Sequence, residues 1–164
     1  MESRAQWQSE AMAAAFALAE EAAAEGEIPV GAVVVDRDGK IIGRGRNRRE
    51  SGDPLGHAEL YAIREAAERL GDWRLEGTTM LVTLEPCAMC AGALVNARVA
   101  RLVFAAPDPK AGFCGTLGNL VQDSRLNHRL EVEGGFMEER SRDLLRDFFR
   151  QLRQRDRTER WQSG

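Results

Sequence analysis

Two short segments of the sequence carry the residue types of a metal site. His57 and Glu59 lie two positions apart, and Pro86 precedes Cys87 and Cys90, which lie three positions apart. One imidazole nitrogen and two thiolates fill three corners of a Zn²⁺ tetrahedron and leave the fourth for water, as catalytic rather than structural zinc sites require. Glu59 is not needed as a ligand, so it remains free to transfer protons in a hydrolytic reaction.

The spacing within each segment predicts how the side chains reach one ion. Cys87 and Cys90 would share one face of a helix with Pro86 in its first turn, where the positive end of the helix dipole lowers thiol pKa values. His57 and Glu59 are about 200° apart around an ideal helix, so a first-turn position suits them better than a mid-helix position. From there His57 can bind the ion while Glu59 approaches the bound water from the side.

Two other interpretations of the cysteine pair remain open. A Cys-x-x-Cys pair also occurs in redox dithiols and in closed structural zinc sites. A redox dithiol needs no His-x-Glu partner, and a closed site needs a fourth ligand, for which Cys114 and His128 are the remaining Cys or His candidates. The joint occurrence of the two segments therefore favours the catalytic site.

Composition frames the kind of protein that carries these motifs. With 164 residues, 43% hydrophobic and 30% charged, the sequence predicts a single globular domain over residues 1–164. Three cysteines argue against a disulfide framework and for a reducing compartment. The apolar run 11–19 is too short to span a bilayer and is flanked by Glu10 and Glu20, unlike a secretory signal. We therefore expect a cytoplasmic protein with no membrane association.

The charges are unevenly distributed along the chain. The net charge of −3 does not indicate a nucleic-acid binder, but two segments are rich in arginine. They contain Arg44, Arg46, Arg48 and Arg49, and then Arg140, Arg142, Arg146, Arg150, Arg153, Arg155, Arg157 and Arg160. On its own the second segment would be a solvated helix face, since Asp143 and Asp147 offer helical partners to the arginines. Residues about 154–164 are expected to form a flexible Arg-rich tail.

Hydrophobic periodicity predicts strands that alternate with helices. Helices are predicted at residues 5–25, 56–71, 86–96 and 138–153, and strands at 30–35, 40–45, 79–84, 101–105 and 129–132. This order predicts a three-layer α/β/α sandwich with parallel strand pairs and an antiparallel hairpin at one edge. Both metal-binding segments would start helices, so they can converge at the strand ends, where open sheets bind ligands.

The sequence resembles the cytidine-deaminase-like zinc enzymes, and within them the bacterial tRNA-specific adenosine deaminases. His57-x-Glu59 and Pro86-Cys87-x-x-Cys90 match the signature of the superfamily. Further segments, spread over nearly the whole chain, are similar to the tRNA-acting branch. They are Val82–Glu85, Ala91–Ala93, Asp108–Lys110, Gly115–Leu117, Asn119–Leu120, Asn127–Arg129, Phe148–Phe149 and Leu152–Arg153.

The resemblance implies a five-stranded mixed sheet, a homodimer, and hydrolytic deamination of the wobble adenosine of a tRNA anticodon to inosine. It implies one Zn²⁺ per subunit, held by His57, Cys87 and Cys90 with a bound water or hydroxide, and Glu59 as the catalytic acid and base. It also implies contacts to the anticodon stem-loop. These would come from Asn47, Val30 and Leu84 around the flipped nucleoside, and from Asp108, Lys110, Phe149 and Arg153 at the flanking nucleotides.

Two alternative functions share the same metal residues. An enzyme of the same superfamily acting on free guanine, free cytosine or a nucleoside would use the same zinc site, but it would not need arginine-rich segments to meet phosphates. A catalytically silent RNA-binding or partner subunit would need no carboxylate beside the metal, so Glu59 argues against it. The role of Cys114 stays open.

Overall fold

A mixed five-stranded sheet forms the centre of the structure, a computed structural model that describes residues 3–163. The strands are β1 (Gly31–Val35), β2 (Ile41–Arg46), β3 (Thr79–Leu84), β4 (Arg101–Ala106) and β5 (Glu131–Gly134), arranged in the order β2-β1-β3-β4-β5. β1 pairs antiparallel with β2 and β3, whereas β3, β4 and β5 are mutually parallel. The expected mixed sheet is therefore confirmed, with its last strand at Glu131–Gly134 rather than at 129–132.

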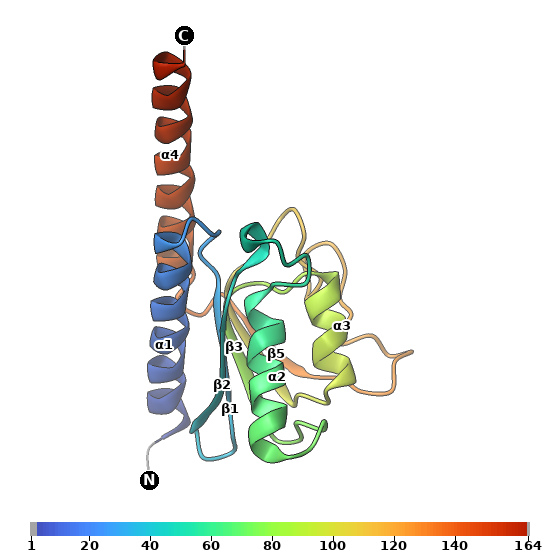
Figure 1. Ribbon diagram of the computed structural model, residues 1–164. Coiled ribbons are helices and arrows are strands. Elements are labelled where there is room, and N and C mark those ends of the chain that lie inside the picture. The colour runs from blue at the N-terminus through green and yellow to red at the C-terminus, as the bar shows by residue number, and fades with distance from the viewer. Residues whose placement is uncertain (1–2, 164) are drawn as a thin grey trace.

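Helices cover both faces of the sheet. They are α1 (Arg4–Ala24), α2 (Ala58–Leu70), α3 (Ala88–Asn96) and α4 (Glu138–Gln162), with a short 3₁₀ turn, η1 (Arg49–Ser51), after β2. α1 and α4 lie on one face and α2 and α3 on the other (Figure 1). The predicted three-layer α/β/α architecture is confirmed. No helix within residues 3–163 is both long and apolar enough to cross a membrane.

The interior strand β1 separates two hydrophobic cores because its side chains alternate between the two faces. Val33 and Val35 pack with Phe16 of α1, whereas Val34 packs with Ala62 of α2. All five residues of β1 are buried. A strand that is buried on both faces has a continuous apolar sequence, which is the pattern that residues 30–35 show.

Glycines in β2 bring α2 unusually close to the sheet. A Cβ atom at Gly43 would lie 2.1 Å from the carbonyl oxygen of Ala62, and one at Gly45 would lie 2.0 Å from that of Ala58. Helix and strand therefore meet backbone to backbone, at a separation that any side chain at these two positions would disrupt. This contact fixes the position of the N-terminus of α2, which carries His57 and Glu59.

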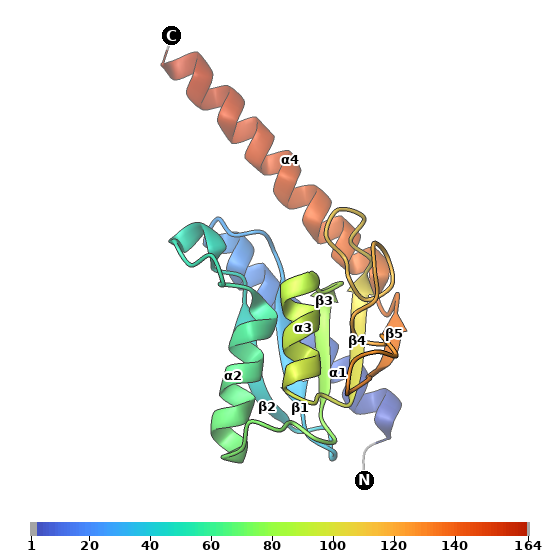
Figure 2. The same cartoon turned by 90° about the vertical axis from the view of Figure 1, so that its right-hand side faces the viewer.

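The C-terminal helix is longer than the sequence predicted. α4 continues to Gln162, where a flexible tail was expected after Arg153, and it projects beyond the body of the molecule (Figure 2). Residues 138–162 contain no glycine or proline and are rich in arginine, glutamine and glutamate, which favour helix. The ion pair Arg142–Glu138 also has i,i+4 helical spacing. The end of the expected tail, residue 164, lies outside the described residues.

Candidate active site

The start of α2 presents His57 and Glu59. His57 is the N-cap residue, with extended backbone angles (φ −94°, ψ 142°), and its N–H donates to the carbonyl oxygen of Leu55 at 2.8 Å. Glu59 lies in the first turn and is 4% exposed. This is the first-turn arrangement that the sequence predicted for the pair. Both side chains can reach the same small volume from there, although they differ by two positions.

The start of α3 presents the two cysteines. Cys87 is the N-cap residue, half-buried, and Cys90 is fully buried in the first turn. Pro86 was predicted to lie in the first turn, but it precedes the N-cap instead. The physical reason is an isolated antiparallel bridge between Cys87 and Gly112, which holds Cys87 in an extended conformation, so the helix starts two residues later than predicted.

Three candidate ligand atoms converge at this point. The Sγ atoms of Cys87 and Cys90 each lie 3.5 Å from Nδ1 of His57, and the three ligand atoms all lie within 4.8 Å of one another. Tetrahedral Zn²⁺ with its usual bond lengths to sulfur and nitrogen places those atoms about 3.6 Å apart. The donor set and its spacing therefore fit a zinc ion.

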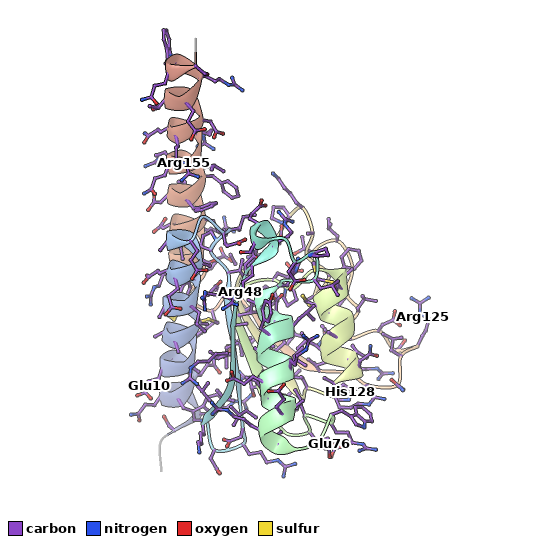
Figure 3. The ribbon with its side chains drawn as sticks, viewed as in Figure 1. Glu10, Arg48, Glu76, Arg125, His128 and Arg155 are labelled. Carbon is purple, nitrogen blue, oxygen red and sulfur yellow. The ribbon has the colours of Figure 1, made fainter. Side chains whose placement is uncertain are left out.

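Neither candidate for a fourth ligand joins the cluster. Nε2 of His128 lies 2.7 Å from the carbonyl oxygen of Val99, on another part of the molecule (Figure 3). The Cys114 thiol is buried and contacts the carbonyl oxygen of Pro86. Within residues 3–163 the group that could hold a metal consists of one histidine and two cysteines. The arrangement thus has three protein ligands, the number typical of catalytic zinc.

The cluster also changes the acidity of its members. Hydrogen bonds from Cys90 and His57 lower the pKa of the Cys87 thiol to about 4. The same contact with Cys87, together with burial, raises the pKa of the Cys90 thiol. Burial raises the pKa of the Glu59 carboxyl to about 7. A carboxyl group with such a pKa can both accept and release a proton near neutral pH.

A small pocket opens directly above the cluster. Its volume is about 150 Å³, and His57, Glu59 and Cys87 form its base. Four residues implied by the resemblance also line it, namely Val30, Asn47, Leu84 and Asp108. The structure therefore brings these predicted residues together with the metal cluster. Cys90 is fully buried and does not line the pocket.

Three of the predicted site residues lie outside the pocket. Lys110 is exposed on the turn that follows Asp108, and its backbone N–H donates to the Asp108 carboxylate at 3.0 Å. Phe149 and Arg153 are exposed on α4, and the ring of Phe149 packs edge-on against Phe148. Their roles at flanking nucleotides remain predictions.

Residues that the sequence did not assign to the site also reach it. Ile28 and Arg49 line the pocket, as does Glu85. Arg49 belongs to the first arginine-rich segment, and that segment was the sequence signal that could have placed Arg49 in the site. Glu85 belongs to the Val82–Glu85 segment, but nothing in a sequence distinguishes a buried glutamate from a solvated one.

Two buried carboxylates hold the loops on either side of the pocket. Glu85 is 2% exposed and accepts hydrogen bonds from the backbone of Asp108 (3.1 Å), Cys114 (3.0 Å) and Thr116 (3.2 Å), and from the Thr116 hydroxyl. Glu27 is 1% exposed and accepts from the backbone of Glu50 at 2.7 Å and from the hydroxyl of Ser51 at 2.8 Å. Each carboxylate therefore ties one pocket-lining loop to the body of the domain.

Comparisons with known proteins identify the family of the chain. Residues 6–153 match the family described as MafB19-like deaminase, which places the chain among the deaminases. It is 50% identical over 143 residues to the tRNA-specific adenosine deaminase of Bacillus subtilis (strain 168), covering 87% of this chain and 88% of the relative. The chain belongs to the tRNA-specific adenosine deaminase family.

Solved structures of deaminases share the fold of the chain. A structure from a study of A-to-I editing by tRNA:A34 deaminases at the wobble position of transfer RNA is 40% identical, with a TM-score of 0.79, and covers 84% of this chain and 99% of that chain. The guanine deaminase of Nitrosomonas europaea is 25% identical, with a TM-score of 0.74, and covers 84% of this chain and 82% of that chain.

Proposed function

We propose that this chain hydrolyses the wobble adenosine of a tRNA anticodon to inosine, with Zn²⁺ held by His57, Cys87 and Cys90. The observation that carries the proposal is the buried carboxylate of Glu59 beside a three-ligand cluster at the base of a pocket. Such a carboxylate contributes nothing to a structural zinc site, whereas a hydrolytic site requires it. The 50% identity to a tRNA-specific adenosine deaminase supports adenosine in tRNA as the substrate.

The reaction consumes water and releases ammonia, so protons must move twice. When bound, Zn²⁺ supplies Lewis acidity that makes water a nucleophile near neutral pH. Glu59 accepts a proton from the attacking water at its carboxylate and delivers it to the purine ring as C6 is attacked. A second transfer moves the other proton of that water from the new C6 hydroxyl to the amino group, the bond between C6 and the amino nitrogen breaks, and ammonia departs to leave inosine. The buried position of Glu59 beside the ligand cluster suits both transfers.

The walls of the pocket position the base. The Asn47 amide donates to the carbonyl oxygen of Ile28 at 3.2 Å and accepts from the backbone N–H of Arg49 at 3.2 Å. These hydrogen bonds fix its orientation and leave one donor and one acceptor position for the substrate. Val30 and Leu84 supply apolar surface for the faces of the base.

The volume of the pocket supports a substrate base that is flipped out of the RNA stack. Its 150 Å³ is well below the roughly 300–1,000 Å³ of pockets that enclose drug-sized ligands. A nucleobase could enter such a pocket while the rest of the nucleotide stays outside. Enzymes that act on bases within nucleic acids extrude the target base into a pocket in this way.

An RNA assay with a matched pair of variants tests the proposal. Zinc-loaded protein is incubated with an anticodon stem-loop that has adenosine at the wobble position, and inosine is measured by mass spectrometry. We expect Glu59→Gln to lower turnover by at least about 10²-fold with zinc content retained, because it removes the proton carrier. The same substitution at the exposed Glu76 should have no effect (Figure 3). Wild-type turnover by Glu59→Gln would refute the assignment.

Hydrolysis of a free base is the second candidate function. It is favoured by the similarity to the guanine deaminase of Nitrosomonas europaea. The same protein preparation is therefore assayed with free guanine and free cytosine. Hydrolysis of either base, together with no inosine from the stem-loop, would establish the free-base activity in place of the proposed one.

The assembly and location of the chain are further parts of the proposal. We propose a homodimer in the cytoplasm with tRNA as its partner. On the outer side of α3, Ala88 is exposed and a Cβ atom at Gly92 would meet no heavy atom within 4 Å, which leaves room for the close approach of a second copy. Light scattering at several concentrations measures the mass, and a monomer at all of them would exclude the dimer.

A further inference from the structure

A second cavity lies behind the chain segment that walls the pocket. Asn47 and Arg49 line the pocket, whereas Arg44, Arg46 and Arg48 line a separate groove of about 420 Å³. Side chains along an extended segment point alternately to opposite sides, and neighbouring Cα atoms are about 3.8 Å apart. The pocket and the groove therefore lie back to back across a single stretch of chain.

The groove follows the edge of the sheet. β2 is an edge strand, and its glycines at 43 and 45 face α2, which leaves the side chain of Arg44 on the other face. Tyr61 and Arg64 of α2 contribute to the groove. Figure 3 places Arg48 beside the end of β2, between α1 and α2. The groove is thus a surface channel next to the pocket and separate from the metal cluster.

The groove carries an excess of positive charge. Four arginines line it together with Glu65 and Glu68. Arg46 is neutralised by Glu25 at 2.8 Å and by Glu21 at 3.7 Å. Glu65 in turn pairs with Arg69, which lies outside the groove lining, at 3.7 Å.

The remaining arginines of the groove are available to a ligand. Across residues 3–163, Arg44, Arg48 and Arg64 take part in no ion pair. The guanidinium of Arg48 lies 5.6 Å from the centre of the Tyr61 ring, and the Tyr61 hydroxyl donates to Asp53 at 2.5 Å. This stacking orients the guanidinium and leaves its N–H groups free, and guanidinium groups bind phosphate oxygens in pairs.

We propose that this groove is a second binding site, which takes backbone phosphates of the RNA beyond the nucleotide whose base occupies the pocket. The inference rests on the proposed function, since a polynucleotide that places one base in the pocket must continue across the neighbouring surface. Three unpaired arginines and an aromatic ring on that surface match a phosphate backbone. A free nucleobase, which has no phosphates, would gain nothing from them.

Two charge-matched double variants test the groove. In Arg44→Gln/Arg64→Gln two groove cations are removed, and in Arg37→Gln/Arg125→Gln two exposed cations elsewhere on the surface are removed. Binding of the zinc-loaded full chain to a complete tRNA is followed by fluorescence anisotropy at a series of salt concentrations. Inosine formation at saturating tRNA is measured in parallel.

The groove variant should bind tRNA roughly tenfold more weakly than the wild type. The slope of log affinity against log salt should fall by about 0.7 for each phosphate that is no longer neutralised, hence by about 1.4 for two. Turnover at saturating tRNA should stay unchanged, and the control variant should keep the wild-type slope. An affinity and slope equal to those of the control variant would overturn the groove assignment, even where the wild type forms inosine.

The two proposals can fail separately. A wild type that forms no inosine, while the groove variant still shows a weaker affinity and a smaller slope than the control, would overturn the deaminase proposal and support the groove as a nucleic-acid site. A wild type that binds no RNA would overturn the groove. Thermal melting of both double variants verifies that they are folded.

Discussion

Replacement of Glu85 by glutamine should destabilise the domain far more than a surface substitution of the same kind. One carboxylate oxygen accepts from the Asp108 N–H and the Thr116 hydroxyl, and the other accepts from the N–H groups of Cys114 and Thr116. A glutamine keeps most of these hydrogen bonds when its amide nitrogen faces the Thr116 hydroxyl. The hydroxyl then accepts a hydrogen bond from the amide instead of donating one. In that orientation the N–H of Asp108 is left without its acceptor.

The decrease in stability caused by Glu85→Gln follows from these hydrogen bonds. A buried N–H group without a partner costs about 1–3 kcal/mol, and the change from charged to neutral acceptors weakens the two other backbone hydrogen bonds by about 1 kcal/mol each. The expected decrease in stability is therefore about 3–5 kcal/mol, which is a large part of the 5–15 kcal/mol typical of a folded domain. For a domain of this size that corresponds to a fall in Tm of about 6–20 °C.

Denaturant unfolding followed by circular dichroism measures this decrease, and calorimetry gives the Tm. Glu76→Gln is the control, since Glu76 is exposed and surface substitutions change stability by no more than about 0.5 kcal/mol. The variant should also show a higher KM, because Asp108 lines the pocket. Equal stability of the Glu85 and Glu76 variants would refute the idea that this carboxylate holds the loop.

Three further predictions concern the metal, the helix–strand contact and the C-terminal helix. Cys90→Ser should abolish stoichiometric zinc binding, because it removes one of three ligands; full occupancy by elemental analysis would contradict the ligand assignment. Gly45→Ala should destabilise the fold by about 1–3 kcal/mol, because its Cβ would lie 2.0 Å from the carbonyl oxygen of Ala58; chemical unfolding measures the change, and wild-type stability would contradict the close helix–strand contact. Truncation after Arg153 should change the free energy of unfolding by less than about 0.5 kcal/mol, since residues 154–163 are exposed; a larger change would show that the end of α4 packs against the domain.

The features that were predictable from the sequence are those that depend on local pattern. The continuous apolar run at 30–35 and the alternation of strands and helices predicted the layers, because burial on two faces leaves a clear signature. The group that could hold a metal was predictable because histidine and cysteine are rare here, with two and three copies, and because their spacing matches a metal site. Element boundaries were less accurate, as the start of α3 shows, since a tertiary bridge to Gly112 decides it.

Residues whose role depends on distant partners were not predictable. Glu27 and Glu85 look like the other acidic residues of the chain, and only the fold reveals that backbone N–H groups surround them. The same holds for Gly43 and Gly45, where an added Cβ atom would lie about 2 Å from backbone oxygens of α2. Burial by residues that are distant in the sequence does not change the local sequence pattern, whereas helix and strand periodicity does.

The buried carboxylates explain how residues on loops can be held in precise positions around the site. Catalytic groups must be held within a fraction of an ångström, and loops are the most mobile parts of a fold. Here the candidate metal ligands lie at helix N-termini that the sheet fixes, and the two flanking loops are each anchored by a charged acceptor with several donors. Because charged hydrogen bonds are about twice as strong as neutral ones, one glutamate can restrain a whole loop. The geometry of the pocket therefore depends on residues that need not touch the substrate. Variants of Glu27 and Glu85 should weaken substrate binding more than they weaken metal binding.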